Sequence, residues 1–334
     1  KIATFACHLH SVFHADRNIP DGLFQGQPLC GEVEDSGAHR SKRRAPTRDC
    51  DEDHSADNRD LCYDIRYKRR TFSQKRHDTD VIVWKKTLEE EQGNLLTGAK
   101  YAVGPFYPDS KGWSEDLAKQ VGTNYWAMER FGQFRFPGSE CRPCDNAAKS
   151  GHNDATGLQE TISCENSDFP ARTAQLFWDL LVRVQIGLGL DDLSKAYKQV
   201  ATSTPQFTVV ALWDPYKEMV AYFYLPGHNF GCISSVNNFI RLPLSIVAIL
   251  RQRFGISLCS YFDDYCIVEP MLYGTNAQRI LLLLHVLFGL QVEKKKHIKF
   301  SICAAFLGVM TDFNLYLSGI IIIRITKDRR EKLL

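Results

Sequence analysis

Apolar residues recur at regular intervals along most of the chain after residue 80. Intervals of three and four predict helices that begin near residue 81 and that cover residues 238–254 and 279–290. Alternating or short apolar runs predict strands within 207–212, 219–225, 256–268, 306–310 and 315–325, the first two forming a hairpin. Elements mixed in this order predict an α+β or α/β fold whose sheet is covered on one face.

Residues 1–79 lack such a pattern. They mix basic blocks at 41–44 and 68–70 with an acidic stretch at 49–53. High charge with little apolar periodicity is typical of disordered chain, so we expect this segment to be largely disordered. The basic blocks could bind a nucleic acid or a nuclear import receptor, but a solvated linker is the simpler interpretation, and we assign the segment no function.

Composition adds limits to the possible function. The 334 residues are 44% hydrophobic and 24% charged, which excludes a collagen, a coiled coil or a wholly disordered chain. A net charge of +2 means that any affinity for nucleic acid must come from local basic clusters. Eleven cysteines without a repeated spacing favour free thiols, hence an intracellular protein, cytoplasmic or nuclear. The longest apolar runs are too short to span a membrane, so we expect no membrane partner.

Two acidic stretches carry the candidate chemistry. Asp263 and Asp264 stand between apolar strand formers, which predicts a hairpin turn that presents both acids, although for such a pair taken alone an ordinary solvated turn is the simpler interpretation. Asp191 and Asp192 end a predicted strand and lead into a helical turn. If the two strands are neighbours, the acids meet. Carboxylate ligands favour Mg²⁺ or Mn²⁺ over Zn²⁺, and a two-metal phosphoryl transfer site needs such a pair.

The motifs around these acids resemble those of reverse transcriptases. Asp192-Leu-Ser-Lys-Ala-Tyr197 resembles the first palm motif of that family, and Tyr261-Phe-Asp-Asp264 resembles its Tyr-x-Asp-Asp motif. Four further matches resemble the fingers, Leu-Pro-Phe-Gly, Gly-Leu/Lys-Lys and primer-grip motifs: Arg142-Pro143-Cys144-Asp145 with Gly151-His152-Asn153, Leu225-Pro226 with Phe230-Gly231, Gly289-Leu290 with Lys294-Lys295-Lys296-His297, and Phe306-Leu307-Gly308. The resemblance covers about residues 81–334 and is closest to retrotransposon enzymes of the LTR or tyrosine-recombinase type.

This resemblance implies a polymerase palm, an antiparallel sheet backed by helices, with a fingers subdomain. Residues 80–190 would form the fingers and the start of the palm, 191–325 the palm with its catalytic carboxylates, and 326–334 the start of a largely absent thumb. The implied activity is that of an RNA-directed DNA polymerase. It adds dNTPs to a primer 3′-hydroxyl on an RNA or DNA template with two Mg²⁺ or Mn²⁺ ions.

The resemblance also implies roles for single residues. Asp192, Asp263 and the backbone carbonyl of Leu193 would hold the ions, Asp264 would support the site, and Lys296 would protonate the leaving pyrophosphate. The residues implied to bind dNTP are Arg142, Tyr197, Phe230 and Gly231, with the Tyr197 ring excluding a 2′-hydroxyl, and the implied primer grip is Phe306, Leu307 and Gly308. Simpler alternatives are a core aromatic for Tyr197, a solvated lysine run around Lys296 and a surface ion pair for Arg142. Asp191 matches nothing, and we expect a structural or electrostatic role for it.

Several departures from the family pattern bear on activity. Residues 227–229 are an insertion that could displace Phe230 from the nucleotide, and Glu140-Cys141 replaces residues that are often aromatic and basic. With the missing thumb, they suggest a decayed copy that acts at most as a nucleic-acid-binding module, which is the second hypothesis. A third is another palm-type nucleotidyltransferase, against which Tyr197 argues. Cys141 and Cys144 could be half of a zinc site, but no second ligand pair follows at a suitable spacing.

Overall fold

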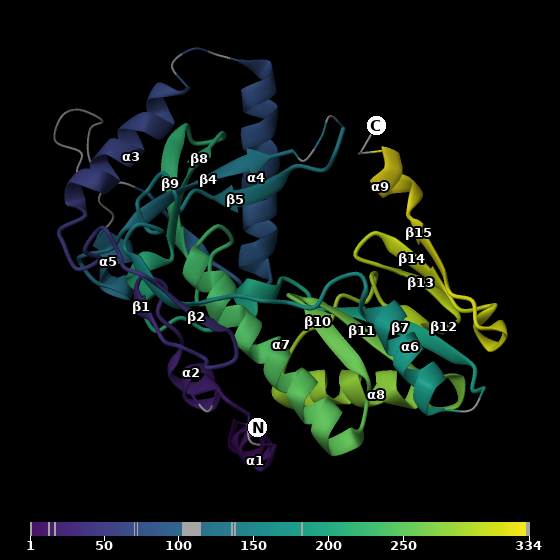
Figure 1. Cartoon of the computed structure of the whole chain (residues 1–334). Helices are drawn as coiled ribbons and strands as arrows, with labels where there is room; N and C mark the ends of the chain where they lie inside the picture. Colours follow the sequence, from purple (N-terminus) through teal and green to yellow (C-terminus); the bar gives the residue numbers. More distant parts are fainter. Residues whose placement is uncertain are drawn as a thin grey trace.

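The computed structural model describes residues 2–12, 14–16, 18–69, 71, 73–101, 115–134, 136, 138–181 and 183–331. They form a mixed α+β fold, which confirms the predicted class (Figure 1). Its helices are α1 (Ile2–Ser11), α2 (Ile19–Gln25), α3 (Ser55–Tyr67), α4 (Gln74–Gln92), α5 (Glu115–Val121), α6 (Phe169–Leu180), α7 (Ile233–Phe254), α8 (Met271–Phe288) and α9 (Lys327–Glu331), with 3-10 turns at Ala196–Gln199, Pro205–Phe207 and Tyr316–Ser318.

The strands form a three-stranded sheet β1-β6-β2, a five-stranded sheet β3-β9-β8-β4-β5, a four-stranded sheet β10-β11-β7-β12 and a three-stranded sheet β13-β14-β15. Their bounds are β1 (Gly31–Val33), β2 (Arg40–Arg44), β3 (Thr97–Tyr101), β4 (Ala127–Gln133), β5 (Arg142–Asp145), β6 (Thr156–Thr161), β7 (Ile186–Asp192), β8 (Val209–Asp214), β9 (Met219–Tyr224), β10 (Leu258–Tyr261), β11 (Asp264–Pro270), β12 (Ile298–Ser301), β13 (Cys303–Phe306), β14 (Val309–Asp312) and β15 (Ile322–Ile325).

The four-stranded sheet is antiparallel and carries apolar side chains on both faces. Leu258, Tyr265 and Ile267 pack against α7 and α8, while Cys266 and Val268 pack with side chains of α6, β13 and the residues near Tyr316. The prediction of a sheet covered on one face is therefore wrong for this sheet. Alternation along a strand sends successive side chains to opposite faces, so a strand such as β11 needs a nearly continuous apolar sequence when both faces are buried.

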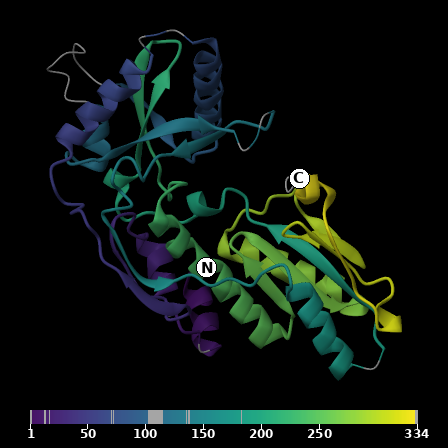
Figure 2. The ribbon, with the colours of Figure 1, turned by 45° about the horizontal axis from the view of Figure 1, so that its top comes forward.

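The five-stranded sheet lies between α4 on one face and α3 with α5 on the other. Val83 and Trp84 of α4 join one apolar cluster, and Ile65 of α3 joins the other. The predicted hairpin of β8 and β9 is confirmed, with Asp214 opposite Met219 at its end. Because β8 and β9 pair with β4 and β3, a boundary at residue 190 does not separate one sheet from another. Figures 1 and 2 show the four-stranded sheet between this sheet on one side and the β13–β15 sheet on the other.

The N-terminal segment corrects the expectation of disorder, because α1, α2, β1, β2 and α3 all fall before residue 79. The ring of Phe5 packs on that of Phe288 of α8, with 4.4 Å between centroids and 49° between the ring planes. Asp16 forms a buried ion pair with Arg241 of α7, with oxygen–nitrogen distances of 2.5 and 2.8 Å. The apolar positions of this segment are too sparse to show a period, but they complete the core around α7 and α8. Contacts far along the chain, rather than local pattern, determine its order.

Other predicted elements differ in their bounds. α4, α7 and α8 begin several residues before the predicted starts at 81, 238 and 279. Pro243 lies inside α7. Residues 306–310 form the end of β13, the turn at Leu307 and Gly308, and the start of β14 instead of one strand. Residues 102–114 lie outside the described residues.

Within the described residues, α7 is the helix that length and composition would allow to cross a membrane. Its mean hydropathy is 1.5, but 78% of the apolar window is buried inside the protein. Most of its side chains therefore contact the rest of the protein, as those of a core helix do. The predicted location inside the cell stays a prediction.

The buried Asp16–Arg241 pair predicts a large cost when one partner is removed. Asp16→Ala leaves a guanidinium that is 2% exposed without its counterion. We expect the free energy of unfolding to fall by about 3–5 kcal/mol, measured by urea denaturation. Glu165→Ala removes one partner of a more exposed pair with Arg172 and should cost at most about 1 kcal/mol. Equal losses in the two variants would contradict the assignment of α1 and α2 to the folded core.

Candidate active site

The pairing of β7 with β11 brings the two acidic stretches together. Asp192 on β7 stands directly opposite Asp264 on β11. Asp263 occupies the turn before β11, and its backbone carbonyl accepts a hydrogen bond from the Leu193 amide at 3.1 Å. The predicted hairpin turn and the predicted meeting of the strands are both confirmed. We call β10, β11 and the intervening turn the acidic hairpin.

Strand alternation sends Asp191 and Asp192 to opposite faces of the sheet. The Asp191 carboxylate lies 2.6 Å from His297 Nδ1 and accepts a hydrogen bond from Gln278 Nε2 of α8 at 3.0 Å. Burial raises the pKa of Asp191, although the contacts with His297 and Gln278 oppose that shift. The expectation that Asp191 has a structural role agrees with this geometry, because its oxygens already bind groups of the protein.

Asp192 lies on the other face, with its side chain 3% exposed and in contact with the Lys296 ammonium. Burial, together with the Asp192 carboxylate, raises the pKa of Asp263 to about 6. The same two causes, in the same order, raise the pKa of Asp264, and Lys296 opposes them. Burial lowers the pKa of Lys296, but the hydrogen bond and the charge of Asp192 outweigh it, so that the pKa lies above its ordinary value. Three acids around one buried position therefore leave a local excess of negative charge, which a cation would neutralise.

The turn of the acidic hairpin is strained. Phe262 has a φ of +52°, a left-handed conformation that costs a bulky residue of order 1–3 kcal/mol. Its ring packs edge to face on Tyr261, with 5.0 Å between centroids. Strain of this kind persists only where the surrounding structure enforces it, and here the strand pairing on both sides fixes the turn. The conformation presents Asp263 at the end of the hairpin.

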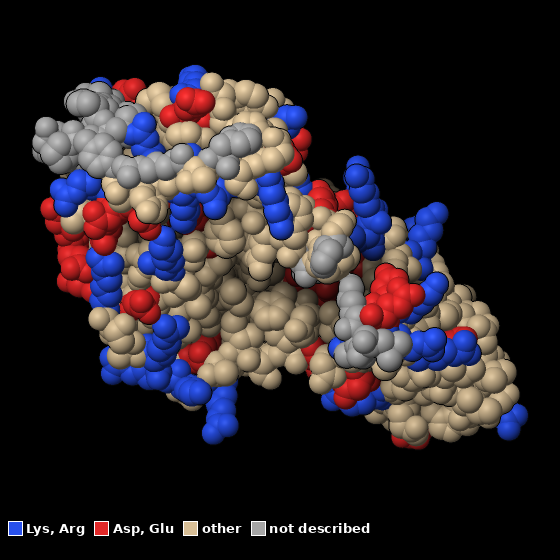
Figure 3. Space-filling view, turned by 90° about the horizontal axis from the view of Figure 1, so that it is seen from above, with Lys and Arg blue, Asp and Glu red and all other residues tan. Residues whose placement is uncertain are grey.

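A cavity of about 280 Å³ opens in front of the acids. Figure 3 shows the surface hollowed on this side, with acidic side chains at the edge of the hollow. Six predicted site residues line the cavity: Asp192, Leu193, Tyr197, Phe230, Asp263 and Lys296. The Tyr197 ring is 5.8 Å from that of Phe230 and 5.3 Å from that of Phe239, between centroids. Burial and the charge of Asp263 raise the pKa of Tyr197 to about 12, so its hydroxyl stays protonated.

Four charged side chains form one wall of the cavity, and of these only Asp145 belongs to a motif noted in the sequence. Arg130 of β4 pairs with Asp145 of β5 at 2.7 Å and with Glu90 of α4 at 2.9 Å. Glu90 also contacts the ammonium of Lys198, which follows Tyr197. Two cations and two anions thus connect the five-stranded sheet to the residues beside Asp192. The four residues are far apart in the sequence and come together only in the folded chain, so the local sequence does not predict this group.

The inserted residues 227–229 do not form a free loop. Asn229 is fully buried, and its side-chain amide donates to Asp145 at 3.1 Å. A side chain at Gly227 would collide with the backbone of Lys198, so only glycine fits there. Phe230, which follows the insertion, still lines the cavity. Gly231 lies against the Asp145 carbonyl with a φ of +119°, which again favours glycine.

Other predicted site residues lie apart from the cavity lining. Arg142 is exposed on β5, although Pro143 and Asp145 of the same strand do line the cavity. Phe306 is 2% exposed and packs in the core between the four-stranded sheet and α6. Leu307 and Gly308 form the turn between β13 and β14, with φ of +50° and +76°. These three residues are thus a buried anchor and a tight turn.

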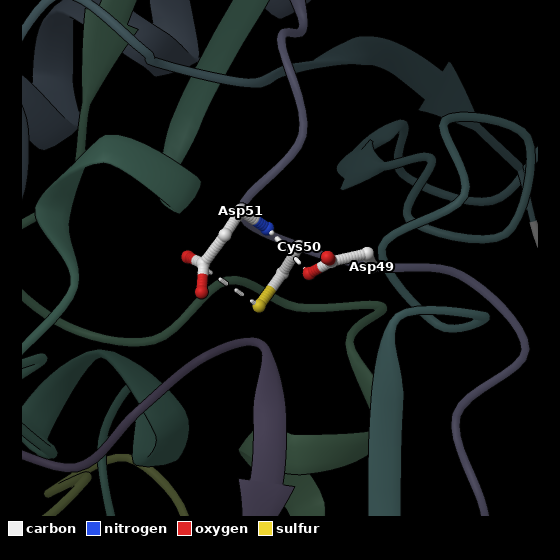
Figure 4. Close-up of side chains that lie close together, drawn as sticks. All are labelled: Asp49, Cys50 and Asp51. Atoms are coloured by element: carbon white, nitrogen blue, oxygen red, sulfur yellow. Dashed lines mark hydrogen bonds between the residues drawn. The ribbon is translucent and has the colours of Figure 1, made fainter.

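Possible metal ligands outside the cavity gather at one place. Asp49, Cys50 and Asp51 are the group of three His, Cys, Asp or Glu ligands within 4.8 Å of one another that the described residues contain (Figure 4). Burial, followed by the charges of Asp51 and Asp49, raises the pKa of the Cys50 thiol, which disfavours a metal-binding thiolate. Cys141 and Cys144, considered for zinc, are not in such a group. Within the described residues, the acids of the hairpin do not form such a group either.

Comparison with protein-family models and with curated proteins gives no match for this sequence. The geometry of the cavity and the motifs in the sequence are therefore the basis for a functional conclusion.

The raised pKa of Asp263 predicts a stability change with pH. Because its pKa rises on folding from 3.8 to about 6, the folded state holds the proton more tightly. In a buffer that contains a metal chelator, the free energy of unfolding should therefore decrease as the pH rises from about 4 to about 6. The contribution of Asp263 to this decrease should be absent in Asp263→Asn. Melting temperatures across that range measure the difference between the two proteins.

Magnesium should reverse that loss. Above pH 6, we expect Mg²⁺ to raise the melting temperature of the natural sequence but not of Asp263→Asn, since the ion would neutralise the repelling carboxylates. Asp51→Asn, in the exposed acidic group, is the matched control and should keep the response. If the response is lost in Asp51→Asn and kept in Asp263→Asn, the cation binds at the exposed Asp49–Asp51 group and not at the acidic hairpin, which would contradict this prediction.

Proposed function

We propose that this chain is the RNA-directed DNA polymerase domain of a retrotransposon, with a palm formed by the four-stranded sheet and a fingers subdomain that includes the five-stranded sheet. The observation that carries the proposal is the convergence of Asp192 and Asp263 in one cavity with Tyr197, Phe230 and Lys296. These residues are 104 positions apart at the extremes, and they come from separate motifs that resemble the same family in the same order. Its substrates are dNTPs and a primer annealed to an RNA or DNA template.

Two Mg²⁺ or Mn²⁺ ions fit the donor set. Asp192, Asp263 and the Leu193 carbonyl would hold them, in a place where buried acids already repel one another. When bound, such ions activate the attacking hydroxyl and stabilise the charge on the departing pyrophosphate. Lys296 would have to leave Asp192 for the ions to bind, and its side chain is 62% exposed, which allows that movement.

The other residues act on the nucleotide. Lys296 keeps its proton because its pKa is raised, and an ammonium released from Asp192 can donate that proton to pyrophosphate. The Tyr197 ring, held between Phe230 and Phe239, is suited to lie under a deoxyribose and to exclude a 2′-hydroxyl. Ser194 and Lys195 also line the cavity between Asp192 and Tyr197.

A second candidate function is binding of a primer–template duplex without synthesis. The exposed position of Arg142 favours it, because the guanidinium implied to contact the incoming nucleotide is outside the cavity lining. The contact between Lys296 and Asp192 favours it as well, since it neutralises one metal-binding acid. The insertion at 227–229 does not, because its residues are buried supports of the cavity wall.

Primer extension distinguishes the two functions. Asp263→Asn should reduce the rate of dNTP addition by orders of magnitude, because a carboxamide holds the cations poorly. Asp191→Asn changes the neighbouring acid that faces α8 and should retain extension, with a cost in stability from its contacts to His297 and Gln278. Salt-sensitive duplex binding without extension in the natural sequence would support the binding function instead.

Sugar selection is a separate test of Tyr197. Tyr197→Ala should admit rNTPs and narrow the discrimination against them by roughly 10–200-fold, the range for one shape contact in a pocket. Tyr197→Phe keeps the ring and should keep the discrimination. If the natural sequence itself prefers rNTPs, the chain is another palm-type nucleotidyltransferase.

A further inference from the structure

The strand β2 carries an exposed row of basic side chains. Its sequence is Arg-Ser-Lys-Arg-Arg, and all five residues are exposed. β2 is an edge of the three-stranded sheet and pairs only with β6 among the described strands. In the described structure, Arg40, Lys42 and Arg43 make no ion pair, and Arg44 donates to the Asn153 carbonyl at 3.2 Å. The charges of this strand are therefore available to a partner.

The second basic block of the N-terminal segment differs in this respect. Lys68 pairs with Glu129 at 2.6 Å and Arg69 pairs with Asp80 at 2.5 Å, while Arg70 lies outside the described residues. The charges of Lys68 and Arg69 are thus neutralised inside the protein. The two basic blocks look alike in sequence, but in the described structure the side chains of β2 are the ones without an acidic partner.

β6 connects this strand to the acidic hairpin. Arg40 pairs with Thr161 at the end of β6. Thr161 and Cys164 line an open groove of about 470 Å³ with Tyr261 and Phe262 of the hairpin. Cys164 and Phe262 thus lie on the same groove. Three residues span at most about 11 Å and neighbouring strands lie about 4.8 Å apart, so the basic row begins within roughly 16 Å of Cys164.

Acidic residues of the same sheet are already engaged. Glu160, opposite Ser41, accepts hydrogen bonds from Ser36 at 2.7 and 2.8 Å. Glu32 of β1 accepts one from Gln159 at 2.8 Å. Figure 3 shows further Lys and Arg side chains gathered along a rim of the hollowed face. A partner at β2 thus meets unpaired positive charge, which is complementary to a phosphodiester backbone.

We propose that β2 binds the backbone of the nucleic acid that passes the acidic hairpin, an inference that rests on the proposed polymerase function. A five-residue strand is about 13 Å long, which spans a short run of neighbouring phosphates of one strand. The contact involves no base and is therefore independent of sequence. It extends the grip on the template–primer beyond the cavity, on the side where β6 and the hairpin meet.

The alternative role for charges on an edge strand is protection against aggregation, since unpaired strand edges associate with one another and lysine or arginine prevents this. The two roles give different results when the charges are removed. Loss of edge protection changes the association state of the protein. Loss of a phosphate contact changes the salt dependence of nucleic-acid binding.

The test is the affinity for a labelled RNA–DNA hybrid with a single-stranded template overhang, measured over a series of KCl concentrations. In the combined variant Arg40→Gln, Lys42→Gln and Arg43→Gln, the slope of log affinity against log salt should fall by up to about 3, since each lost phosphate contact contributes about 0.9. The single variant Arg43→Gln should lower the slope by about 1. Arg279→Gln, at an exposed position on α8, is the control of the same residue type and should not change it.

Each outcome decides between the inferences. An unchanged slope in the combined variant, with tight hybrid binding, overturns the role of β2 and leaves the polymerase proposal intact. An unchanged slope with new self-association, seen by light scattering, assigns the charges to edge protection and also overturns it. A reduced slope in a protein that never extends a primer supports the β2 contact and removes the polymerase proposal. A blunt hybrid and a single-stranded RNA probe distinguish duplex from overhang contact.

Discussion

The register of β7 against β11 is the constraint on which the candidate site depends. A shift of one residue would send Asp192 to the face of α8 and Asp191 to the cavity, because side chains alternate between faces. The register is fixed by apolar packing on both faces, with Leu188 and Val268 on one side and Ile267 on the other. Gly187 adds to this, since a side chain there would collide with Met271, Ser301 and Phe300, and Gly189 leaves only a tight space of 3.1 Å to Gln278 and Phe300. The core of the sheet thus determines which acid is presented.

This arrangement buries the carboxylates of the two acidic stretches away from water. Asp191 and Asp192 are each 2% exposed, and the pKa values of Asp191, Asp263 and Asp264 are raised, first by burial. Lys296 and His297, from one short basic segment after α8, contact the two acids of β7 on their separate faces. The His297 ring lies 2.6 Å from Asp191 and its side chain is 27% exposed, whereas the Lys296 ammonium contacts Asp192 and its side chain is 62% exposed. The two acids of β7 therefore differ in how freely their basic partners can move.

Local patterns in the sequence predicted those elements whose own residues show a clear apolar periodicity or turn sequence. The hairpin of β8 and β9 and the turn at Asp263 followed from alternation and from polar residues between apolar runs. Long-range contacts decided what could not be predicted. The order of residues 2–69 depends on contacts such as Phe5 with Phe288 and Asp16 with Arg241, which join positions more than two hundred residues apart. The wall of Arg130, Glu90 and Lys198 likewise joins three elements, and none of the three residues belongs to a motif.

Long-range contacts also bear on whether the insertion at 227–229 indicates an inactive protein. In the sequence, the insertion at 227–229 suggested a loop pushed between the motif and the nucleotide. In the folded chain, Asn229 binds Asp145, and Asp145 binds Arg130, so the inserted residues support the cavity wall instead of filling the cavity. The match is incomplete, because both ring nitrogens of His228 and Oδ1 of Asn229 are buried without a hydrogen-bond partner, and an unmatched buried group costs about 1–3 kcal/mol. The case for an inactive protein therefore rests on this incomplete match, on the exposed Arg142 and on the Lys296–Asp192 contact, and the last two involve side chains that can move.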